Sequence, residues 1–523
     1  MTPIAASGSR FAIASPHAAA TEAGLDALDR GGNAVDAALC AACLLSVVYP
    51  HMCGPGGDLF AIVAEPGAKT SCINSSGAAA ASVDVAGLRT SGEMPTTGPL
   101  TITVPGAVAG WELLSRSGRL GLEDALQPAI DAARSGTAVA PGLARALCEA
   151  APRLRSDAGM RALFFPDDHP LQEDDVLIQG ALADTLEGIA QEGSAAMRGG
   201  SIGAELVAGL RRLGAPLQAS DLEGHVPDVE VPLVGSYRGW GISTAPPNSQ
   251  GFVLLLALAL VERLGVEPDP LGPDASTVAA IFELCNTERD RHLCDPRFTG
   301  VDLRFMLNDA YIESLVAAVR NDRIASAPRA SPRAGGDTIA VVAADSEGWA
   351  VSLIQSLFHS FGAGILEPAT GIIAHNRGAS FSLDEGSPNL LVPGKRPAHT
   401  LMPVVVHRGG RLAAVTGSMG GRAQPQIHAQ VLMRLLDGGL DPALAVDAPR
   451  WTVGAQDEGA PRHPLFIEAR AGHIIDALKA AGRDVRVLPP RSDEAGHYQA
   501  ITITKDGFSV AADPRSDGAA AAR

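Results

Sequence analysis

Apolar residues near the start of the chain follow the spacing of two helices and a strand. Ala18–Leu28 has apolar positions at intervals of three and four and stops before a pair of glycines, which is typical of a helix end. Asn33 can cap a second helix over Ala34–Val47. A tight turn at Gly54–Gly57 then leads into a strand over Leu59–Ala64. These signals predict mixed α and β structure.

The middle of the chain is mainly helical in pattern. Helical spacing extends from about Ala107 to Arg212 and is interrupted by the irregular, charged stretch Pro166–Asp175. Val229–Trp240 is typical of a strand, and Gly251–Leu264, after two prolines, of a buried helix. No repeat of solenoid period is present.

The second half contains a junction between a polar linker and a buried hairpin. Ala325–Gly336 is small, polar and rich in proline, which is the composition of a mobile, exposed linker. Directly after it, the apolar runs Asp337–Ala343 and Trp349–Ser356 flank an Asp/Gly turn and predict a β-hairpin. A flexible segment therefore leads directly into a buried strand. This arrangement is unusual in an ordinary fold.

Composition and charge narrow the classes of function. The 523 residues are 46% hydrophobic and carry a net charge of −17, which predicts a soluble globular protein and argues against nucleic-acid binding. The longest apolar stretch, Gly251–Val261, is far shorter than the roughly 20 residues of a membrane span. Met1–Arg10 lacks the pattern of a signal peptide, so we expect a cytoplasmic protein that binds no membrane.

The cysteines and histidines predict neither a disulfide framework nor a metal site. The seven cysteines are odd in number and lack paired metal spacing, so we expect reduced, buried side chains. They are Cys40, Cys43, Cys53, Cys72, Cys148, Cys285 and Cys294. The thirteen histidines are dispersed, and no metalloprotease, P-loop or dinucleotide motif is present. We expect no cofactor and no metal.

The junction at Asp337–Thr338 suits self-cleavage. A hydroxyl at Thr338 could attack the Asp337 carbonyl, and hydrolysis of the resulting ester would free the threonine α-amine. Such an amine can activate the hydroxyl beside it, and its ordinary pKa of about 7.7–8 suits a general base. The alternative is a plain domain linker followed by a strand.

Two further segments carry groups that acyl transfer needs. Gly417–Gly421 lies between a predicted strand, Leu412–Thr416, and a predicted helix, Gln426–Leu436, where adjacent glycine amides can form an oxyanion hole. Arg396–Pro403 places a histidine and a threonine in a loop bounded by prolines. A plain tight turn and a solvated loop are the alternatives.

Together these segments resemble the γ-glutamyltranspeptidase family of N-terminal-nucleophile hydrolases. The family's signatures occur in order along nearly the whole chain. They are Ala14–His17 with Thr21–Gly24 and Gly31–Ala38, Tyr49–Gly57, Val104–Trp111, Gln127–Ile130, Pro246–Gly251 and Asp513–Ser516.

The resemblance implies an α+β fold, the four-layer αββα sandwich. It implies a large subunit, residues 1–337, and a small subunit, residues 338–523, produced by cleavage between Asp337 and Thr338. Thr338 would be the nucleophile, Gly420 and Gly421 the oxyanion-hole donors, and Ser356 a second hydroxyl that hydrogen-bonds the nucleophile. The fragments would remain a heterodimer, and a dimer of heterodimers is left open.

Departures from the family pattern fall in the pocket for the glutamyl group. The segment Ile73–Gly77 lacks the family's arginine, with Ser76 nearest to it, and Ser380 stands where the family has an aspartate. His399-Thr400-Leu401 replaces paired serines, and Phe358 replaces an asparagine. Loss of both charged partners removes several kcal/mol of recognition of an α-amino acid. We therefore expect the chemistry without the glutamyl specificity.

The remaining pattern resembles a divergent branch with oxamate amidohydrolases and cephalosporin-acylase-like members. Arg377 is then the candidate for a substrate carboxylate, with a surface ion pair as its alternative. Asn376, His399, Thr400, Ser380, Phe358 and His359 are the other candidate substrate-binding residues. The expected substrate is a small amide or acyl compound.

Four other functions remain open. The chain could be a true γ-glutamyltransferase or glutathione hydrolase, or it could cleave a carbon–carbon bond with the same site. Gly199–Gly203 fits the G-x-S-x-G pattern of a serine hydrolase around Ser201, but no convincing strand precedes it. An unprocessed binding protein of the same fold is the fourth.

Overall fold

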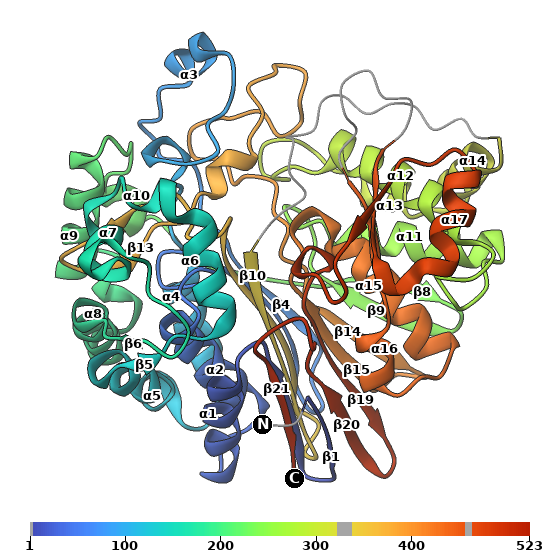
Figure 1. Ribbon diagram of the computed structural model, residues 1–523, viewed down its shortest axis with the longest axis horizontal. Coiled ribbons are helices and arrows are strands. Elements are labelled where there is room, and N and C mark those ends of the chain that lie inside the picture. The colour runs from blue at the N-terminus through green and yellow to red at the C-terminus, as the bar shows by residue number, and fades with distance from the viewer. Residues whose placement is uncertain (1–3, 322–336, 455–462) are drawn as a thin grey trace.

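Two seven-stranded antiparallel sheets stack face to face in the centre of the molecule, and helices cover both outer faces (Figure 1). The computed structural model describes residues 4–321, 337–454 and 463–523. The layer order is helix, sheet, sheet, helix, so the expected α+β, four-layer αββα sandwich is confirmed. The predicted linker Ala325–Gly336 lies outside the described residues.

The first sheet joins both ends of the chain to its middle. Its strands, in spatial order, are β1 (Ala5–Gly8), β20 (Gly507–Ala511), β19 (Tyr498–Thr504), β15 (Arg411–Ser418), β14 (Val404–Arg408), β9 (Trp240–Thr244) and β8 (Leu233–Tyr237).

The second sheet carries the predicted hairpin at its centre. Its strands, in spatial order, are β21 (Ala519–Ala522), β2 (Phe11–Ser15), β10 (Asp337–Asp345), β11 (Ala350–Phe358), β3 (Asp58–Ala64), β4 (Ser71–Ser75) and β7 (Asp228–Glu230).

Short strands form three smaller sheets. They pair as β12 (Leu366–Glu367) with β13 (Ile372–Ile373), β5 (Thr137–Ala138) with β6 (Val176–Leu177), and β17 (Leu465–Glu468) between β16 (Trp451–Val453) and β18 (Val485–Leu488).

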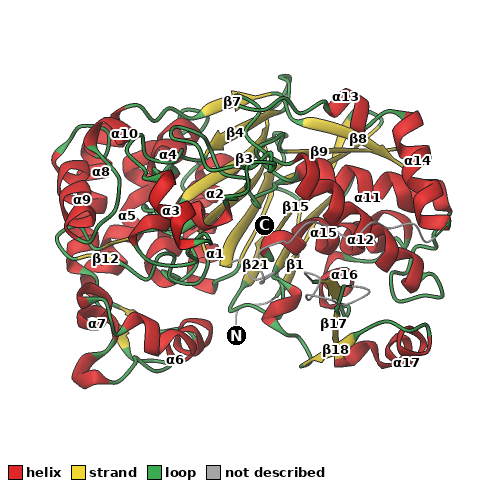
Figure 2. Ribbon diagram, turned by 90° about the horizontal axis from the view of Figure 1, so that it is seen from above, coloured by secondary structure: helices red, strands yellow, loops and turns green. Residues whose placement is uncertain are grey.

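The helices divide into two groups, one beside each sheet (Figure 2). The helices that precede β7 are α1 (Ala18–Asp29), α2 (Ala34–Val48), α3 (Val85–Ser91), α4 (Ala107–Ser115), α5 (Gly121–Ser135), α6 (Pro141–Leu154), α7 (Ala158–Phe164), α8 (Gly180–Glu192), α9 (Ser201–Arg212) and α10 (Ala219–Glu223). Those that follow β9 are α11 (Gly251–Leu264), α12 (Ala275–His292), α13 (Leu303–Met306), α14 (Asp309–Arg320), α15 (Gln424–Leu432), α16 (Pro442–Asp447) and α17 (Gly472–Ala480).

Three apolar cores hold the layers together. One lies between the second sheet and α1, α2, α4, α5 and α8, and another between the first sheet and α11, α12 and α15. Between the sheets the core consists largely of small and β-branched side chains such as Ala340 and Val415. These residues let the strands pack closely, because β-branched side chains suit a pleated surface buried on both faces.

Several local predictions are confirmed. The Asn33 side chain accepts hydrogen bonds from backbone N–H groups in the first turn of α2, and the Asn33 backbone N–H donates to the Asp36 carboxylate, which is a capping box. The helices α1 and α11 and the hairpin of β10 and β11 lie where their patterns predict them.

Other predictions need correction. Val229–Trp240 is divided among β7, β8 and the start of β9, because the chain crosses there from one sheet to the other. The helix predicted over Gln426–Leu436 begins at Gln424 and ends in a π-helical turn, Met433–Asp437. Six cysteines are buried as expected, but Cys148 is exposed.

Candidate active site

Thr338 is the second residue of β10, at the centre of the second sheet (Figure 1). Its side chain is 1% exposed, and its Oγ1 donates a hydrogen bond of 3.1 Å to Ser356 Oγ on β11. The Ser356 hydroxyl in turn donates to the carbonyl oxygen of Asp337 at 2.5 Å and accepts from the Phe358 amide at 2.8 Å. One serine therefore contacts both the predicted nucleophile and the carbonyl before it.

The glycine turn follows the end of β15. Gly417, in the first sheet, lies against Ala340 of β10 in the second sheet, two residues beyond Thr338, so this turn begins at the same end of the sandwich as the threonine. Gly420 has φ +144 and Gly421 φ +53, and a Cβ on Gly420 would lie 2.4 Å from Ile427 Cδ1. Neither glycine amide donates to another described residue. Two free N–H groups are what an oxyanion hole requires.

Arg377 is a buried cation with an unused donor. It begins a short 3-10 turn, Arg377–Ser380, and its side chain is 1% exposed. Its Nη2 donates to Thr400 Oγ1 at 3.2 Å, whereas among the described residues its Nη1 has no hydrogen-bond partner. Burial lowers the pKa of Arg377 to about 9, while Asp58 acts to raise it, so the group stays charged at neutral pH. The surface ion pair that was its alternative is excluded by this burial.

Phe358 stacks against the guanidinium of Arg377. The Arg377 Cζ lies 3.8 Å from the centre of the Phe358 ring, and the His359 ring lies 4.2 Å from that ring on stacked planes. Asn376 holds this stack of side chains in place. Its Oδ1 accepts from the His359 backbone N–H at 3.0 Å, and its Nδ2 donates to the Thr96 carbonyl at 2.7 Å. Phe358 has φ +80, an uncommon conformation for a bulky residue.

Both ring nitrogens of His399 are hydrogen-bonded. Its Nδ1 accepts from the Leu401 amide at 3.3 Å, which leaves the proton on Nε2, 3.1 Å from Asp58 Oδ2. Burial and nearby Arg377 lower the pKa of His399 to about 3, although Asp58 opposes the shift, so the ring is neutral at pH 7. The side chain is 0% exposed, so it has no free nitrogen to offer a substrate.

The two serines at the positions of the family's charged residues are occupied elsewhere. The Ser380 hydroxyl donates to the carbonyls of Arg377 and Ala398. The Ser76 hydroxyl donates to Asn74 Oδ1 at 2.7 Å. Neither brings a charge to the site.

Three residues at the site were missed by the sequence reasoning. Asp58 opens β3 and pairs with Ser356 in the strand register. His375 Nδ1 lies 3.5 Å from Asp58 Oδ2. Gln250 Nε2 donates to the carbonyls of Thr400 and Gly421 and so links the arginine side of the site to the glycine turn. Two of these residues had a signal in the sequence. Asp58 directly follows the glycine turn Gly54–Gly57, and Gln250 is a polar residue within the motif Pro246–Gly251.

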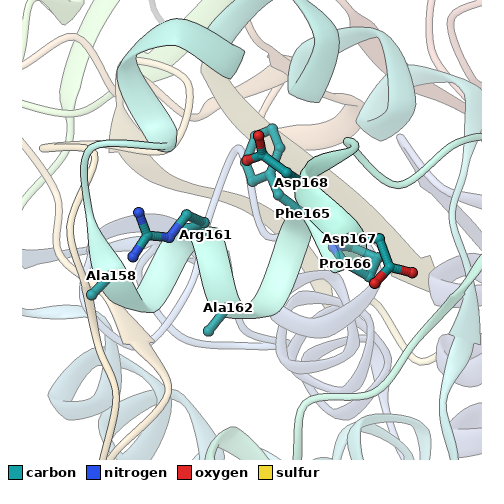
Figure 3. A pocket seen from close by; sticks show the side chains of 7 residues that line it. All are labelled: Ala158, Arg161, Ala162, Phe165, Pro166, Asp167 and Asp168. Carbon is teal, nitrogen blue, oxygen red and sulfur yellow. The ribbon is translucent and has the colours of Figure 1, made fainter.

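The shallow depression of about 660 Å³ in Figure 3 lies elsewhere, over α7. Its lining residues are Ala158, Arg161, Ala162, Phe165, Pro166, Asp167 and Asp168. They all come from one short segment, residues 158–168, so the depression brings together no groups that are distant in the sequence. Ser201 is exposed at the start of α9 and does not follow a strand, which removes the nucleophile-elbow alternative.

The described ranges contain neither a cluster of metal ligands nor a helix that could span a membrane. Within residues 4–321, 337–454 and 463–523, no group of three or more His, Cys, Asp or Glu side chains could hold a metal ion. In the same ranges, no helix has the length and apolar character needed to cross a membrane.

Known proteins similar to this chain identify its family. The family model of γ-glutamyltranspeptidase matches residues 20–523, and the chain belongs to this family. A glutathione hydrolase-like YwrD proenzyme from Bacillus subtilis is 35% identical over 98% of both chains. An oxamate amidohydrolase proenzyme from Klebsiella pneumoniae is 34% identical over 97% of both. A crystal structure of cephalosporin acylase from Bacillus halodurans has a TM-score of 0.90 and 31% identity, covering 99% of this chain and 97% of that one.

The chain is thus an N-terminal-nucleophile hydrolase of the γ-glutamyltranspeptidase family, similar to its acylase and amidohydrolase members.

Proposed function

We propose that the chain cuts itself between Asp337 and Thr338 and then hydrolyses a small, carboxylate-bearing amide through an acyl-enzyme on Thr338. The observation that carries this proposal is the hydrogen-bond chain from Thr338 Oγ1 to Ser356 Oγ and on to the Asp337 carbonyl. It joins the attacking hydroxyl to the bond that must break.

The first reaction is an acyl shift from nitrogen to oxygen. Thr338 Oγ bonds to the carbonyl carbon of Asp337 as the peptide C–N bond breaks, and the hydroxyl proton ends on the threonine nitrogen. Water then hydrolyses the ester, which leaves a carboxylate on Asp337 and a free amine on Thr338. The Ser356 hydroxyl stabilises the charge that develops on the Asp337 oxygen, because it already donates to that atom.

The second reaction uses the new amine as the base. It takes the proton of the Thr338 hydroxyl while the oxygen attacks the substrate carbonyl, and it then protonates the leaving amine. The free N–H groups of Gly420 and Gly421 donate hydrogen bonds to the developing oxyanion, and each donor contributes about 3 kcal/mol. Water releases the acid and restores the hydroxyl.

The proposed substrate is a short monoamide that carries a carboxylate. Nη1 of Arg377 is a buried donor without a partner among the described residues, and an anion would satisfy it. The similarity to an oxamate amidohydrolase supports this class, since oxamate is such a monoamide. Glutamyl substrates are disfavoured, because Ser76 and Ser380 are hydrogen-bonded elsewhere and bring no charge for an α-amino acid.

The two proposed fragments would remain one unit. Residues 338–523 supply β11, β21 and all of β10 except Asp337, whereas residues 1–337 supply β2, β3, β4 and β7 to the same sheet. In that sheet β2 lies between β21 and β10, so strands of the two fragments alternate. The loss of one peptide bond leaves these ladders intact, which supports a heterodimer. The name proenzyme on both curated relatives is consistent with processing.

A substrate panel tests the proposed activity. Purified protein would be given oxamate, malonamate, succinamate, a γ-glutamyl anilide and N-acyl amines, with release of ammonia or amine as the readout. We expect turnover of at least one carboxylate monoamide, retention of activity in Thr338→Ser and loss in Thr338→Ala. Turnover of the γ-glutamyl anilide alone would contradict the substrate class.

A further inference from the structure

A buried aspartate outside the catalytic groups joins the segments that surround Arg377. We infer that Asp58 is the positioning residue of the carboxylate site and thereby a determinant of substrate specificity. This inference rests on the proposed function, because it concerns how Arg377 is held for a substrate anion.

Asp58 contacts three segments that lie far apart in the sequence. Its Oδ1 accepts the Gly77 amide at 3.1 Å, and its Oδ2 lies 3.1 Å from His399 Nε2 and 3.5 Å from His375 Nδ1. The carboxylate is 1% exposed. Burial acts to raise the pKa of Asp58, but His375 and His399 outweigh it and hold that pKa well below its usual range. The group is therefore a carboxylate whenever the protein is folded near neutral pH.

Two of these segments, those of His375 and His399, are close to Arg377 in the sequence or contact its side chain. His375 is two residues before the arginine, and its Nε2 donates to the Thr103 carbonyl at 2.9 Å. His399 is next to Thr400, whose hydroxyl accepts from Arg377 Nη2. Through its hydrogen bond to His399, Asp58 thus holds the loop that receives one N–H group of the guanidinium, and it lies 3.5 Å from His375 near the start of the turn that carries the guanidinium.

The chemistry of the contacts requires a carboxylate. The Gly77 amide and His399 Nε2 are both donors, so the side chain must accept on both oxygens. An asparagine offers one oxygen and would turn an NH₂ group toward the other donor. Moving the His399 proton to Nδ1 would not help, because the Leu401 amide already points at that atom. Asp58→Asn must therefore displace one of the two loops.

Displacement matters because the Arg377 guanidinium makes few directional contacts. Among the described residues these are one hydrogen bond to the Thr400 hydroxyl and the stack on Phe358, and Nη1 has no hydrogen-bond partner. A guanidinium that moves by a fraction of an ångström loses alignment with a carboxylate, while a neutral group at the same place is affected less.

The test is the ratio of kcat/KM for a carboxylate monoamide to kcat/KM for its uncharged diamide. Oxamate against oxamide, malonamate against malonamide and succinamate against succinamide are the three pairs. We expect wild-type protein to prefer the monoamide of at least one pair, and Asp58→Asn to lower that ratio at least tenfold. In an Arg377→Gln background we expect Asp58→Asn to lower the ratio no further.

Asp36→Asn is the matched control. Asp36 is also a buried, hydrogen-bonded aspartate, but it accepts from Asn33, Arg119 and Leu120 at the start of α2. The Asp36→Asn variant should have a lower melting temperature, and its ratio of kcat/KM for monoamide to kcat/KM for diamide should equal the wild-type value.

The inference would be overturned by an unchanged or higher ratio in Asp58→Asn, by an equal fall in Asp36→Asn, or by a full additional fall in the Arg377→Gln background. Absence of any monoamide preference in an active, self-cleaved wild type would also overturn it, while the proposed nucleophile would stand. If Asp58→Asn does not fold, Asp58→Glu, which keeps two acceptor oxygens, must retain more of the preference than His399→Phe, which removes the donor.

Discussion

Ser356 Oγ lies 2.5 Å from the carbonyl oxygen of Asp337 and 3.1 Å from the hydroxyl of Thr338. The serine donates to the first and accepts from the second, so it can stabilise the carbonyl oxygen while it orients the attacking group. We therefore expect Ser356→Ala to slow self-cleavage by about 10²-fold, the typical loss for one oxyanion donor. Ser356→Thr should restore most of the rate, measured as uncut chain against time on a denaturing gel.

Ser352→Ala is the control for this prediction. Ser352 is on the same strand, but its hydroxyl donates to the Thr416 carbonyl on the other sheet. It should process normally, and a similar delay in both variants would argue against a special role for Ser356.

Gly420→Ala should impair turnover more than folding. The added Cβ meets Ile427 Cδ1 at 2.4 Å and φ is +144, so the turn must move and with it the Gly420 and Gly421 amides. We expect kcat/KM to fall by about 10²-fold. The matched variant Gly410→Ala has φ +78 and open space around the new atom, so it should cost about 1 kcal/mol of stability and no activity. Equal activity in the two variants would contradict an oxyanion role.

Phe358→Asn should reduce selectivity while keeping the fold. Asparagine tolerates a positive φ such as the +80 observed here, so the backbone is not strained further. The variant loses the ring that lies 3.8 Å from the Arg377 guanidinium, and such contacts contribute about 0.5–2 kcal/mol. We expect a several-fold rise in KM for carboxylate monoamides and a smaller change for diamides. No difference between the two substrates would show that the stack does not position the arginine.

Acid should destabilise the protein through its buried histidines. Burial lowers the pKa of His51, His399 and His428 to about 3, whereas an unfolded histidine binds its proton near pH 6.5. As pH falls from 6.5 toward 3 the unfolded state takes up these protons and the folded state does not, so the free energy of unfolding decreases. Each histidine contributes up to about 1.4 kcal/mol per pH unit in this window.

His428→Gln isolates one of these contributions, because the hydrogen bonds of His428 are to Tyr498 and Thr416 and not to a proposed catalytic residue. Denaturant unfolding at pH 6 and pH 4.5 should show that the free energy of unfolding falls less between these two pH values for this variant than for wild type. The exposed His169→Gln should match wild type. An unchanged decline in His428→Gln would contradict the assignment.

Local patterns predicted the parts of the fold that depend on local contacts. The Asn33 cap, the α2 helix and the hairpin of β10 and β11 need only residues close in sequence. Strand partners did not follow from pattern, as the division of Val229–Trp240 between two sheets illustrates. The alanine-rich end of the chain likewise forms β21 because β2 offers it a free edge.

The site was predictable to the same extent. The threonine after a polar linker and the paired glycines are visible as short motifs. The contact of Asp58 with His399 spans 341 residues, and no spacing rule connects them. Free donors such as Nη1 of Arg377 become evident only when burial and partners are known together.

The most direct test of the account is the intact mass of the purified protein, together with the first residue of each fragment. Self-cleavage predicts two chains, residues 1–337 and 338–523, with threonine at the start of the second, and one uncut chain for Thr338→Ala. An active wild-type protein with an intact Asp337–Thr338 bond, or a Thr338→Ala variant that is still cut there, would contradict it.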